Sequence, residues 1–329
     1  MSGGEQKYYW GDTPNEEDYY RFQGVRSTSS LYTSPRSLSL FTRSWLPLSS
    51  STRAIILMLH GYGNDISWTF QATAIHLARN GFACFALDLE GHGRSQGLKA
   101  YVPNLPLLAQ DCLSFFKSTM ASNPDLEKLP SFLFGESMGG ALCLLIHFLE
   151  PDRFNGAVLV APMCKISDKV RPKWPIPQAL TLISWFFPTL PVVPTADLLD
   201  KSVKVLEKRV VARRNPTRYA GRPRLGTVVE LLRFTDWLSE RLSEVKLPFL
   251  VVHGSADEVT DPEVSRSLYE AARSEDKSIR VYEGMMHSLL FGETDENVEL
   301  VRGDILAWLK ERCREEGENE REMISWISL

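Results

Sequence analysis

The sequence lacks a long apolar run of the kind that spans a membrane. Its most apolar window, residues 176–193, is interrupted by Pro177, Pro188 and Pro191 and carries polar side chains between them. A membrane-spanning helix needs about 20 mostly apolar residues, so we expect none here. The first twenty residues are acidic and polar, whereas a secretory signal is basic and then apolar. We therefore expect a cytoplasmic protein.

The chain also lacks the patterns of disulfide scaffolds, metal sites and nucleic-acid binding. Its five cysteines are odd in number, widely spaced and without a CxxC pair, so we expect reduced thiols. Its six histidines are scattered and include no HExxH pair, which argues against a metal site. The 37 Lys and Arg residues are outnumbered by 41 Asp and Glu, and a net charge of -4 offers no general attraction to nucleic acid.

What the sequence does contain is a regular alternation of short strand patterns and longer helical patterns. This order is typical of βαβ units and predicts an α/β fold, with a mostly parallel sheet covered by helices on both faces. Strands are expected at residues 40–46, 54–60, 82–89, 131–134, 157–161, 249–253 and 278–282. Helices are expected at residues 66–80, 105–121, 138–149, 261–273 and 297–312.

The alternation stops in one long segment, where prolines, an aromatic helical stretch and a basic stretch follow one another without strand signals. Because this segment starts just after one strand and ends before the next, we interpret it as an insertion in the sheet fold, a helical cap or lid. The expected organisation is residues 1–162 and 231–313 as the two parts of the core, 163–230 as the cap, and 314–329 as a charged, flexible tail.

The strongest chemical signal is a GxSxG sequence, Gly135-Glu136-Ser137-Met138-Gly139, between an expected strand and an expected helix. Glycines on both sides of the serine allow a turn so tight that a side chain would clash, and the turn exposes the serine oxygen. A glycine-rich turn with an incidental serine is the alternative, but the strand and helix around it favour the functional interpretation. We predict that Ser137 is a catalytic nucleophile.

A serine nucleophile needs a general base and a carboxylate that orients the base. Asp257 follows the strand expected at 249–253, and His287 follows the strand expected at 278–282. The order Ser, Asp, His is the one that α/β hydrolases use. Glu258 and Asp261 are rivals for the acid, although Asp261 before Pro262 has the pattern of a helix N-cap.

The remaining histidines fit structural roles better, because His60 and His253 end strands beside glycines and His76 and His147 fall inside expected helices. His287 is therefore the predicted base.

Two backbone amides should face the negative oxygen of the tetrahedral intermediate. One is the amide of Met138, directly after the nucleophile, and we assign the second to Tyr62 in the glycine-containing loop 60–63. A simple strand-to-helix turn is the alternative for this loop. His60 and Asp65 also fit an HxxxxD acyltransferase box, but the oxyanion loop already accounts for these residues.

A second glycine-containing loop, residues 88–95, follows a strand but lacks the third glycine of a dinucleotide-binding loop. We interpret it as a structural loop, with His92 engaged in local hydrogen bonds.

The expected cap contains an apolar and a basic stretch. The apolar stretch would cover the approach to Ser137, and we predict substrate contacts from Leu180, Ile183, Trp185 and Phe186; burial of these side chains against the core is the alternative. Residues 201–224 carry nine basic side chains against one acid, Glu207. This charge suits an anionic membrane surface, and an ordinary solvated helix face is the alternative.

These motifs together resemble the plant monoacylglycerol lipase and lysophospholipase-like α/β hydrolases, the group that includes caffeoylshikimate esterase. The resemblance covers almost the whole chain and rests on residues 60–63, 88–95, 134–140, 253–260 and 282–289. It implies the α/β-hydrolase fold with a cap over an acyl tunnel. It also implies the triad Ser137, Asp257 and His287 and the oxyanion amides of Tyr62 and Met138. Members of the group hydrolyse monoacylglycerols, lysophospholipids or caffeoylshikimate.

We therefore expect a serine hydrolase that cleaves the acyl ester of a small molecule, first of all a monoacylglycerol or lysophospholipid, through an acyl-enzyme on Ser137. The alternatives are a caffeoylshikimate or related phenylpropanoid esterase and, in another class, a small-molecule receptor on the same fold. The reaction needs water and no cofactor or metal. Peripheral attachment to the endoplasmic reticulum or plasma membrane is a separate expectation from the cap composition.

Overall fold

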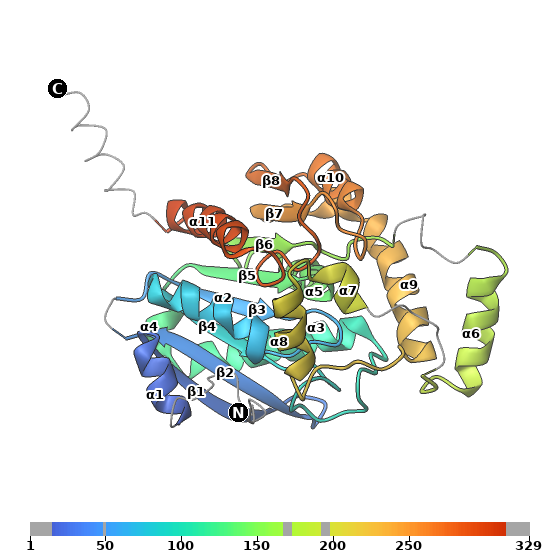
Figure 1. Ribbon diagram of the computed structural model, residues 1–329, viewed down its shortest axis with the longest axis horizontal. Coiled ribbons are helices and arrows are strands. Elements are labelled where there is room, and N and C mark those ends of the chain that lie inside the picture. Colours follow the sequence, from blue (N-terminus) through green and yellow to red (C-terminus); the bar gives the residue numbers. More distant parts are fainter. Residues whose placement is uncertain (1–14, 49–50, 167–172, 192–197, 314–329) are drawn as a thin grey trace.

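The computed structural model describes residues 15–48, 51–166, 173–191 and 198–313. The described chain forms an eight-stranded sheet in the order β1-β2-β4-β3-β5-β6-β7-β8 (Figure 1). The pairs β1–β2 and β2–β4 are antiparallel. The six strands β4, β3, β5, β6, β7 and β8, which follow in the sheet order, run parallel to one another. The strands are β1 (Val25–Thr33), β2 (Ser39–Pro47), β3 (Ala54–Leu59), β4 (Phe82–Leu87), β5 (Ser131–Glu136), β6 (Gly156–Val160), β7 (Phe249–Gly254) and β8 (Lys277–Tyr282).

The central strands are buried on both faces because helices cover both sides of the sheet. In β3, Ile55 and Leu57 pack on one side with α3 (Leu105–Ala121) and α5 (Met138–Leu149). The alternate residues Ile56 and Met58 pack on the other side with α2 (Trp68–Arg79) and α11 (Asp295–Glu311). A continuous apolar run is what a strand with two buried faces requires. The predicted α/β fold is confirmed.

The sequence did not predict the edge strand β1 or the helix α1 (Glu16–Phe22) before it. β1 pairs with β2 along its whole length, from Val25 opposite Pro47 to Thr33 opposite Ser39. Its sequence is rich in serine and threonine, and most of its side chains are exposed or half-buried. An edge strand of this kind needs no apolar alternation, so the main sequence signal for a strand is missing.

Between β6 and β7 the chain leaves the sheet and forms α6 (Ile176–Phe186), α7 (Leu198–Ser202), α8 (Leu206–Arg214), α9 (Leu225–Ser239) and the short η1 (Leu242–Glu244). Helix α9 packs against both α6 and α3. Because it runs from Leu225 to Ser239, it continues past the predicted cap boundary at residue 230. The division into four parts stays a prediction, and the predicted tail 314–329 lies outside the described residues.

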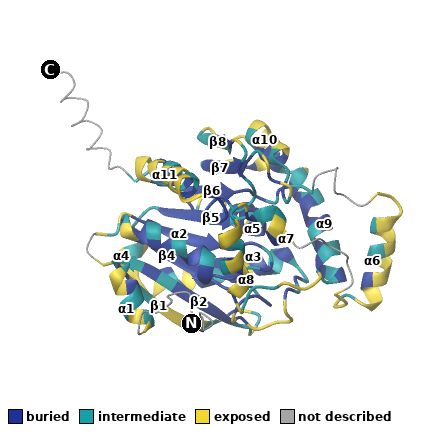
Figure 2. Ribbon diagram, in the orientation of Figure 1, coloured by how far each residue is buried: buried dark blue, intermediate teal, exposed yellow. Residues whose placement is uncertain are grey.

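The remaining helices are α4 (Pro124–Glu127) and α10 (Pro262–Ala271). Burial is uneven over the molecule. Helix α6, which lies at one end of the molecule, is largely exposed, whereas the central strands are buried (Figure 2). Within the described ranges, no helix has both the length and the apolar character needed to cross a bilayer.

Candidate active site

Ser137 lies in the tight turn between β5 and α5. Its backbone has a φ of 53°, in the left-handed region, and its N–H donates to the Val160 carbonyl at 2.9 Å. A Cβ on Gly135 would lie 2.3 Å from the carbonyl oxygen of Gly139, and a Cβ on Gly139 would lie 2.2 Å from that of Leu59. Both flanking glycines are therefore required by close backbone contacts, as the GxSxG pattern predicted.

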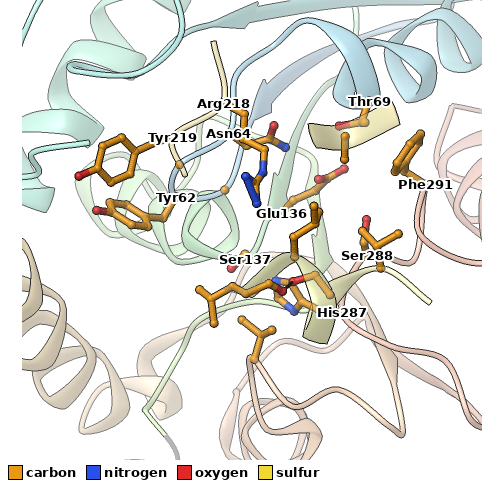
Figure 3. Close-up of a pocket in the computed structure, with 18 of the residues that line it drawn as sticks. Tyr62, Asn64, Thr69, Glu136, Ser137, Arg218, Tyr219, His287, Ser288 and Phe291 are labelled. Carbon is orange, nitrogen blue, oxygen red and sulfur yellow. Dashed lines mark hydrogen bonds between the residues drawn. The ribbon is translucent and has the colours of Figure 1, made fainter. Parts of the chain in front are cut away.

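The structure brings together three predicted residues that are far apart in the sequence. Asp257 follows β7 and His287 follows β8, and Nδ1 of His287 lies 2.7 Å from Oδ2 of Asp257. Ser137 and His287 line the same cavity (Figure 3). These strands are parallel, so the loops after their carboxyl ends meet at one edge of the sheet.

The two rival acids have other roles. Glu258 is exposed and lies 3.3 Å from the Lys201 ammonium group. Asp261 caps α10 by accepting a hydrogen bond from the Glu263 N–H at 3.1 Å.

The carboxylate of Asp257 has polar contacts with several groups besides His287. Its Oδ1 accepts from the backbone N–H groups of Val259 and Thr260 at 2.7 and 3.0 Å, and the Thr260 hydroxyl lies 3.0 Å from Oδ2. Nε2 of His253 lies 3.0 Å from the same Oδ2. Burial alone would raise the pKa of Asp257, but the adjacent imidazoles of His287 and His253 outweigh it and hold the pKa well below its usual range. Asp257 is thus a permanent anion at neutral pH.

The loop expected to supply an oxyanion amide approaches Ser137 closely. A Cβ on Gly61 would lie only 3.3 Å from the Cβ of Ser137. His60 fixes this loop: its Nδ1 lies 2.8 Å from the Gly61 carbonyl, and its Nε2 accepts the Leu89 N–H at 3.0 Å. Burial lowers the pKa of His60, so it stays neutral. His60 is therefore a structural histidine.

The two predicted oxyanion donors lie on the segments that surround the serine. Met138 is the first residue of α5, where helix N–H groups lack intrahelical acceptors. Tyr62 lines the cavity, and its hydroxyl donates to the Ala100 carbonyl at 3.0 Å. Their assignment as donors stays a prediction.

Asp65, the second residue of the HxxxxD pattern, binds the inserted segment. Its Oδ2 accepts hydrogen bonds from Asn215 Nδ2 at 2.6 Å and from the Thr217 hydroxyl at 2.9 Å. Its side chain is 1% exposed in relative terms. Asp65 thus connects the oxyanion loop to the loop between α8 and α9, which is a structural role rather than an acyltransferase role.

The loop 88–95 is also structural, as expected. Asp88 accepts hydrogen bonds from the N–H groups of Ile66 and Arg94, each at 2.8 Å. Burial and the nearby Asp65 raise the pKa of Asp88 to about 7. His92 Nδ1 lies 2.9 Å from the Glu90 carbonyl, so this histidine takes part in local hydrogen bonding.

The cavity around Ser137 has a volume of about 400 Å³ and two walls of different character. The apolar wall comes from α7, the residue after it, α8 and the segment after His287, through Leu198, Leu199, Val203, Ala212, Leu289, Leu290 and Phe291. The polar wall comes from the oxyanion loop and the loop after α8, through Tyr62, Asn64, Arg218, Tyr219 and Arg222. Such a cavity suits a ligand with one apolar and one polar end.

The predicted substrate contacts from α6 need correction. Leu180, Ile183, Trp185 and Phe186 do not line the cavity that holds Ser137. The reason is packing: α6 contacts α9 and stands at the end of the molecule, which leaves Trp185 75% and Phe186 72% exposed (Figure 2). Among the described residues of the insertion, those that reach the cavity lie in 198–223. Leu199 and Val203, at the start of the basic stretch, form a small apolar group that is the sequence signal for this part of the site.

Part of the positive charge of the basic stretch is neutralised by nearby acidic side chains. Five of its side chains pair with acids: Lys201 with Glu258, Lys204 with Glu293, Lys208 with Asp295, and Arg209 and Arg213 with Asp200. In the described part of the chain, no group of three His, Cys, Asp or Glu side chains has the arrangement of a metal site.

A model of the family described as Serine aminopeptidase, S33 matches residues 50–295. The chain belongs to this family. As an S33-family protein with Ser137 on a nucleophile elbow, it is a serine hydrolase. It is 42% identical over 310 residues to caffeoylshikimate esterase of Arabidopsis thaliana, across 94% of this chain and 92% of that protein. It is 30% identical over 280 residues to monoglyceride lipase of Homo sapiens, across 84% of this chain and 89% of that protein.

Solved structures support the fold assignment of this S33 hydrolase. A soluble variant of monoglyceride lipase from Saccharomyces cerevisiae, in complex with a substrate analog, superimposes with a TM-score of 0.75 at 20% identity and covers 88% of this chain and 96% of that chain. The monoacylglycerol lipase of Paleococcus ferrophilus gives a TM-score of 0.68 at 23% identity, with coverages of 83% and 99%. The comparisons confirm the α/β-hydrolase fold and do not favour the receptor alternative.

Proposed function

We propose that this hydrolase cleaves carboxylic esters through an acyl-enzyme on Ser137. The observation that carries the proposal is the 2.7 Å contact between His287 and Asp257 at the cavity that contains Ser137. His287 takes the proton of Ser137 as the hydroxyl oxygen attacks the ester carbonyl, and then gives that proton to the departing alcohol. Water, activated by His287, attacks the acyl-enzyme and releases the acid and free Ser137.

The negative oxygen of each tetrahedral intermediate would bind the amides of Met138 and Tyr62. Loss of one such donor typically costs about 10²- to 10³-fold in kcat. Asp257 fixes the tautomer of His287 and stabilises its protonated form. The several hydrogen bonds that hold Asp257 ionised support this role.

The first candidate substrate is a monoacylglycerol. The apolar wall of the cavity matches a fatty acyl chain, and the polar wall matches the hydroxyl groups of glycerol. The relatives named monoglyceride lipase, 28–30% identical over more than four fifths of this chain, support this choice.

The second candidate is caffeoylshikimate. It is favoured by the 42% identity to a caffeoylshikimate esterase, which extends over 94% of this chain. An aromatic acyl group would pack against Phe291 and Leu199 on the apolar wall, and the hydroxylated alcohol would face the polar wall.

A direct comparison tests both candidates. The purified protein is given monooleoylglycerol and caffeoylshikimate in parallel, and the larger kcat/KM identifies the preferred ester. We expect Ser137→Ala to lower kcat by about a millionfold on either ester. A fluorophosphonate probe should label the wild type and not this variant. Hydrolysis of neither ester, or a Ser137→Ala variant that keeps a tenth of the rate, would refute the proposed mechanism.

We also propose that the exposed aromatic side chains of α6 and the residues before it touch a membrane surface. Trp174, Trp185 and Phe186 are 79%, 75% and 72% exposed, and aromatic side chains favour the interface of a bilayer. The double variant Trp185→Ser/Phe186→Ser should reduce flotation with vesicles of phosphatidylcholine and phosphatidylserine. Phe22→Ser is the matched control, because Phe22 is 78% exposed on α1, far from α6 (Figure 1).

Wild-type protein that never floats with these vesicles would exclude the membrane proposal. The predicted cytoplasmic location, with attachment to the endoplasmic reticulum or plasma membrane, stays a prediction that a fluorescent fusion would test.

A further inference from the structure

The candidate base His287 follows a turn, residues 283–286, rather than lying on a helix or strand. Gly284 in this turn has a φ of 69°, in the left-handed region. The imidazole must face both Asp257 and Ser137 to take the proton of the serine. A misplacement of about 1 Å of a catalytic group can cost roughly 100-fold in rate. The conformation of this turn therefore matters for catalysis.

Glu293 holds one side of the turn. The N–H of Met286, the residue directly before the base, donates to Oε1 of Glu293 at 2.7 Å. The other carboxyl oxygen, Oε2, accepts from Nδ2 of Asn297 at 3.5 Å. The Glu293 side chain is 0% exposed, and Glu293 is not one of the described residues that line the cavity of Ser137. A buried carboxyl group is costly without polar partners, and here the turn supplies one of them.

Lys204, from the inserted segment, holds the other side of the turn. It lies just after α7, and its Nζ donates to the Gly284 carbonyl at 2.9 Å. The same ammonium group lies 3.9 Å from Oε2 of Glu293, within ion-pair distance. Lys204 and Glu293 therefore contact the turn through a carbonyl and through an N–H, and they also contact each other. Polar groups linked in this way restrict a segment more than isolated hydrogen bonds do.

Backbone hydrogen bonds fix the inserted segment to the loop that carries the candidate base. The Ser288 N–H donates to the Ser202 carbonyl at 2.8 Å, and the N–H groups of Lys204 and Val205 donate to the Gly292 carbonyl at 2.9 and 3.0 Å. These bonds do not use the Lys204 side chain, so they should remain when that side chain is replaced. A substitution at Lys204 therefore tests its ammonium group.

We propose that Lys204 and Glu293 are positioning residues for His287. Their ion pair and their hydrogen bonds to the turn hold the imidazole in line with the other two residues of the candidate triad. The inference rests on the proposed ester hydrolysis. It gives the inserted segment a part in the chemistry of the site, in addition to its part in the cavity wall.

The test replaces Lys204 first, because its side chain is 47% exposed and a substitution there should leave the fold intact. Lys204→Met removes the ammonium group at similar length, and Lys204→Arg keeps a cationic donor. Lys201→Met is the matched control, because the Lys201 side chain is 44% exposed and pairs at 3.3 Å with the exposed Glu258. Neither lysine is among the described residues that line the cavity.

The quantities measured are kcat and KM on monooleoylglycerol and caffeoylshikimate, and the rate at which a fluorophosphonate probe labels Ser137. We expect Lys204→Met to lower kcat by roughly 10- to 100-fold with KM within about twofold of wild type, because the base is misplaced while the cavity walls are kept. The labelling rate should fall by a similar factor. Lys204→Arg should recover part of both rates, and Lys201→Met should keep the wild-type values.

A second set of variants tests the carboxyl end of the pair. Glu293→Gln keeps an oxygen that can accept from the Met286 N–H, so it should lose less kcat than Glu293→Met. The double variant Lys204→Met/Glu293→Gln should lose less than the product of the two single losses, since groups in one network are not additive. Thermal unfolding shows which Glu293 variants are folded, and the Lys204 variants decide the question if these are not.

The positioning role is refuted if Lys204→Met keeps the wild-type kcat and labelling rate, or if its loss lies in KM alone. It is also refuted if Lys201→Met lowers kcat equally, because the effect would then come from the charge of the inserted segment in general. In each of these cases an active wild type leaves the proposed ester hydrolysis standing. A wild type that hydrolyses neither ester and is not labelled refutes the proposed function, and the inference with it.

Discussion

Nε2 of His253 lies 3.0 Å from Oδ2 of Asp257, the same oxygen that Nδ1 of His287 approaches at 2.7 Å. His253 is fully buried, and its Nδ1 lies 2.7 Å from the Ser265 hydroxyl. Nε2 also lies 3.0 Å from the Thr260 carbonyl oxygen. These partners assign the proton of His253 to Nε2, where that carbonyl and Asp257 share it, while Nδ1 accepts from the Ser265 hydroxyl. The acid of the candidate triad is thus held between two imidazoles, and His253 acts as a positioning residue for it.

Replacement of His253 should weaken catalysis without removing any group that touches substrate. We expect His253→Leu to lower kcat by about 10-fold, since a lost hydrogen bond to a charged group costs about 1.5 kcal/mol or more. His253→Gln, whose amide N–H can donate to Asp257, should recover part of the rate. A merely structural histidine would instead show equal losses of thermal stability in both variants and no difference in kcat.

The ionised state of Asp257 links stability to pH. Its pKa is depressed in the folded protein, so its charge stabilises the fold at pH values above the ordinary carboxyl pKa of about 4, and this contribution is lost as the pH falls through the folded-state value. The difference in unfolding free energy between wild type and Asp257→Asn should therefore be largest at neutral pH and shrink below about pH 4. Denaturant unfolding at several pH values measures it.

The same variant should lower kcat by roughly 10,000-fold, because an amide cannot hold the productive tautomer of the histidine. Asp152→Asn, at an exposed aspartate, is the control and should change neither quantity. A gap in unfolding free energy that stays constant down to acid pH would contradict the role given to the charge.

Glu136 should affect the pH dependence of the reaction. It lines the cavity, interacts electrostatically with His287, and has a pKa raised to about 7 by removal from water. Its ionised form favours protonated His287, which cannot act as a base. In Glu136→Gln the acid limb of the kcat/KM profile should therefore move to lower pH, by less than about one pH unit. Glu240→Gln, an exposed carboxylate at the end of α9, should leave the profile unchanged.

Replacement of glycine by alanine should have opposite effects on the free energy of unfolding at Gly139 and at Gly303. Gly139→Ala places a Cβ 2.2 Å from the Leu59 carbonyl oxygen, and we expect a loss of about 1–3 kcal/mol or more in unfolding free energy. Gly303→Ala, in the middle of α11 with nothing within 4 Å of the new Cβ, should gain about 0.5–1 kcal/mol. Urea unfolding of both variants checks the pair, and a stable Gly139→Ala would contradict the close packing of the elbow.

The sequence by itself determined the parts of this protein that are encoded in short segments. The elbow around Ser137 is a strand, a turn and a helix in succession, so its chemistry is visible within a few residues. Apolar runs and their breaks were sufficient for the parallel strands. The edge strand β1 was not predicted, because its exposed serines and threonines show no alternation of apolar and polar residues.

Tertiary structure decided which residues share the cavity. Whether Trp185 or Val203 lines the cavity of Ser137 depends on how α6, α7 and α8 pack on the core. An amphipathic pattern predicts which face of a helix is buried, but it does not predict which element that face contacts. The contact of His253 with Asp257 depends on the turn after β7. The position of the cavity-lining Arg218 depends on the hydrogen bonds of its neighbours, from Thr217 to Asp65 and from Tyr219 to Gly63. Long-range packing brings these groups together, and no local pattern records it.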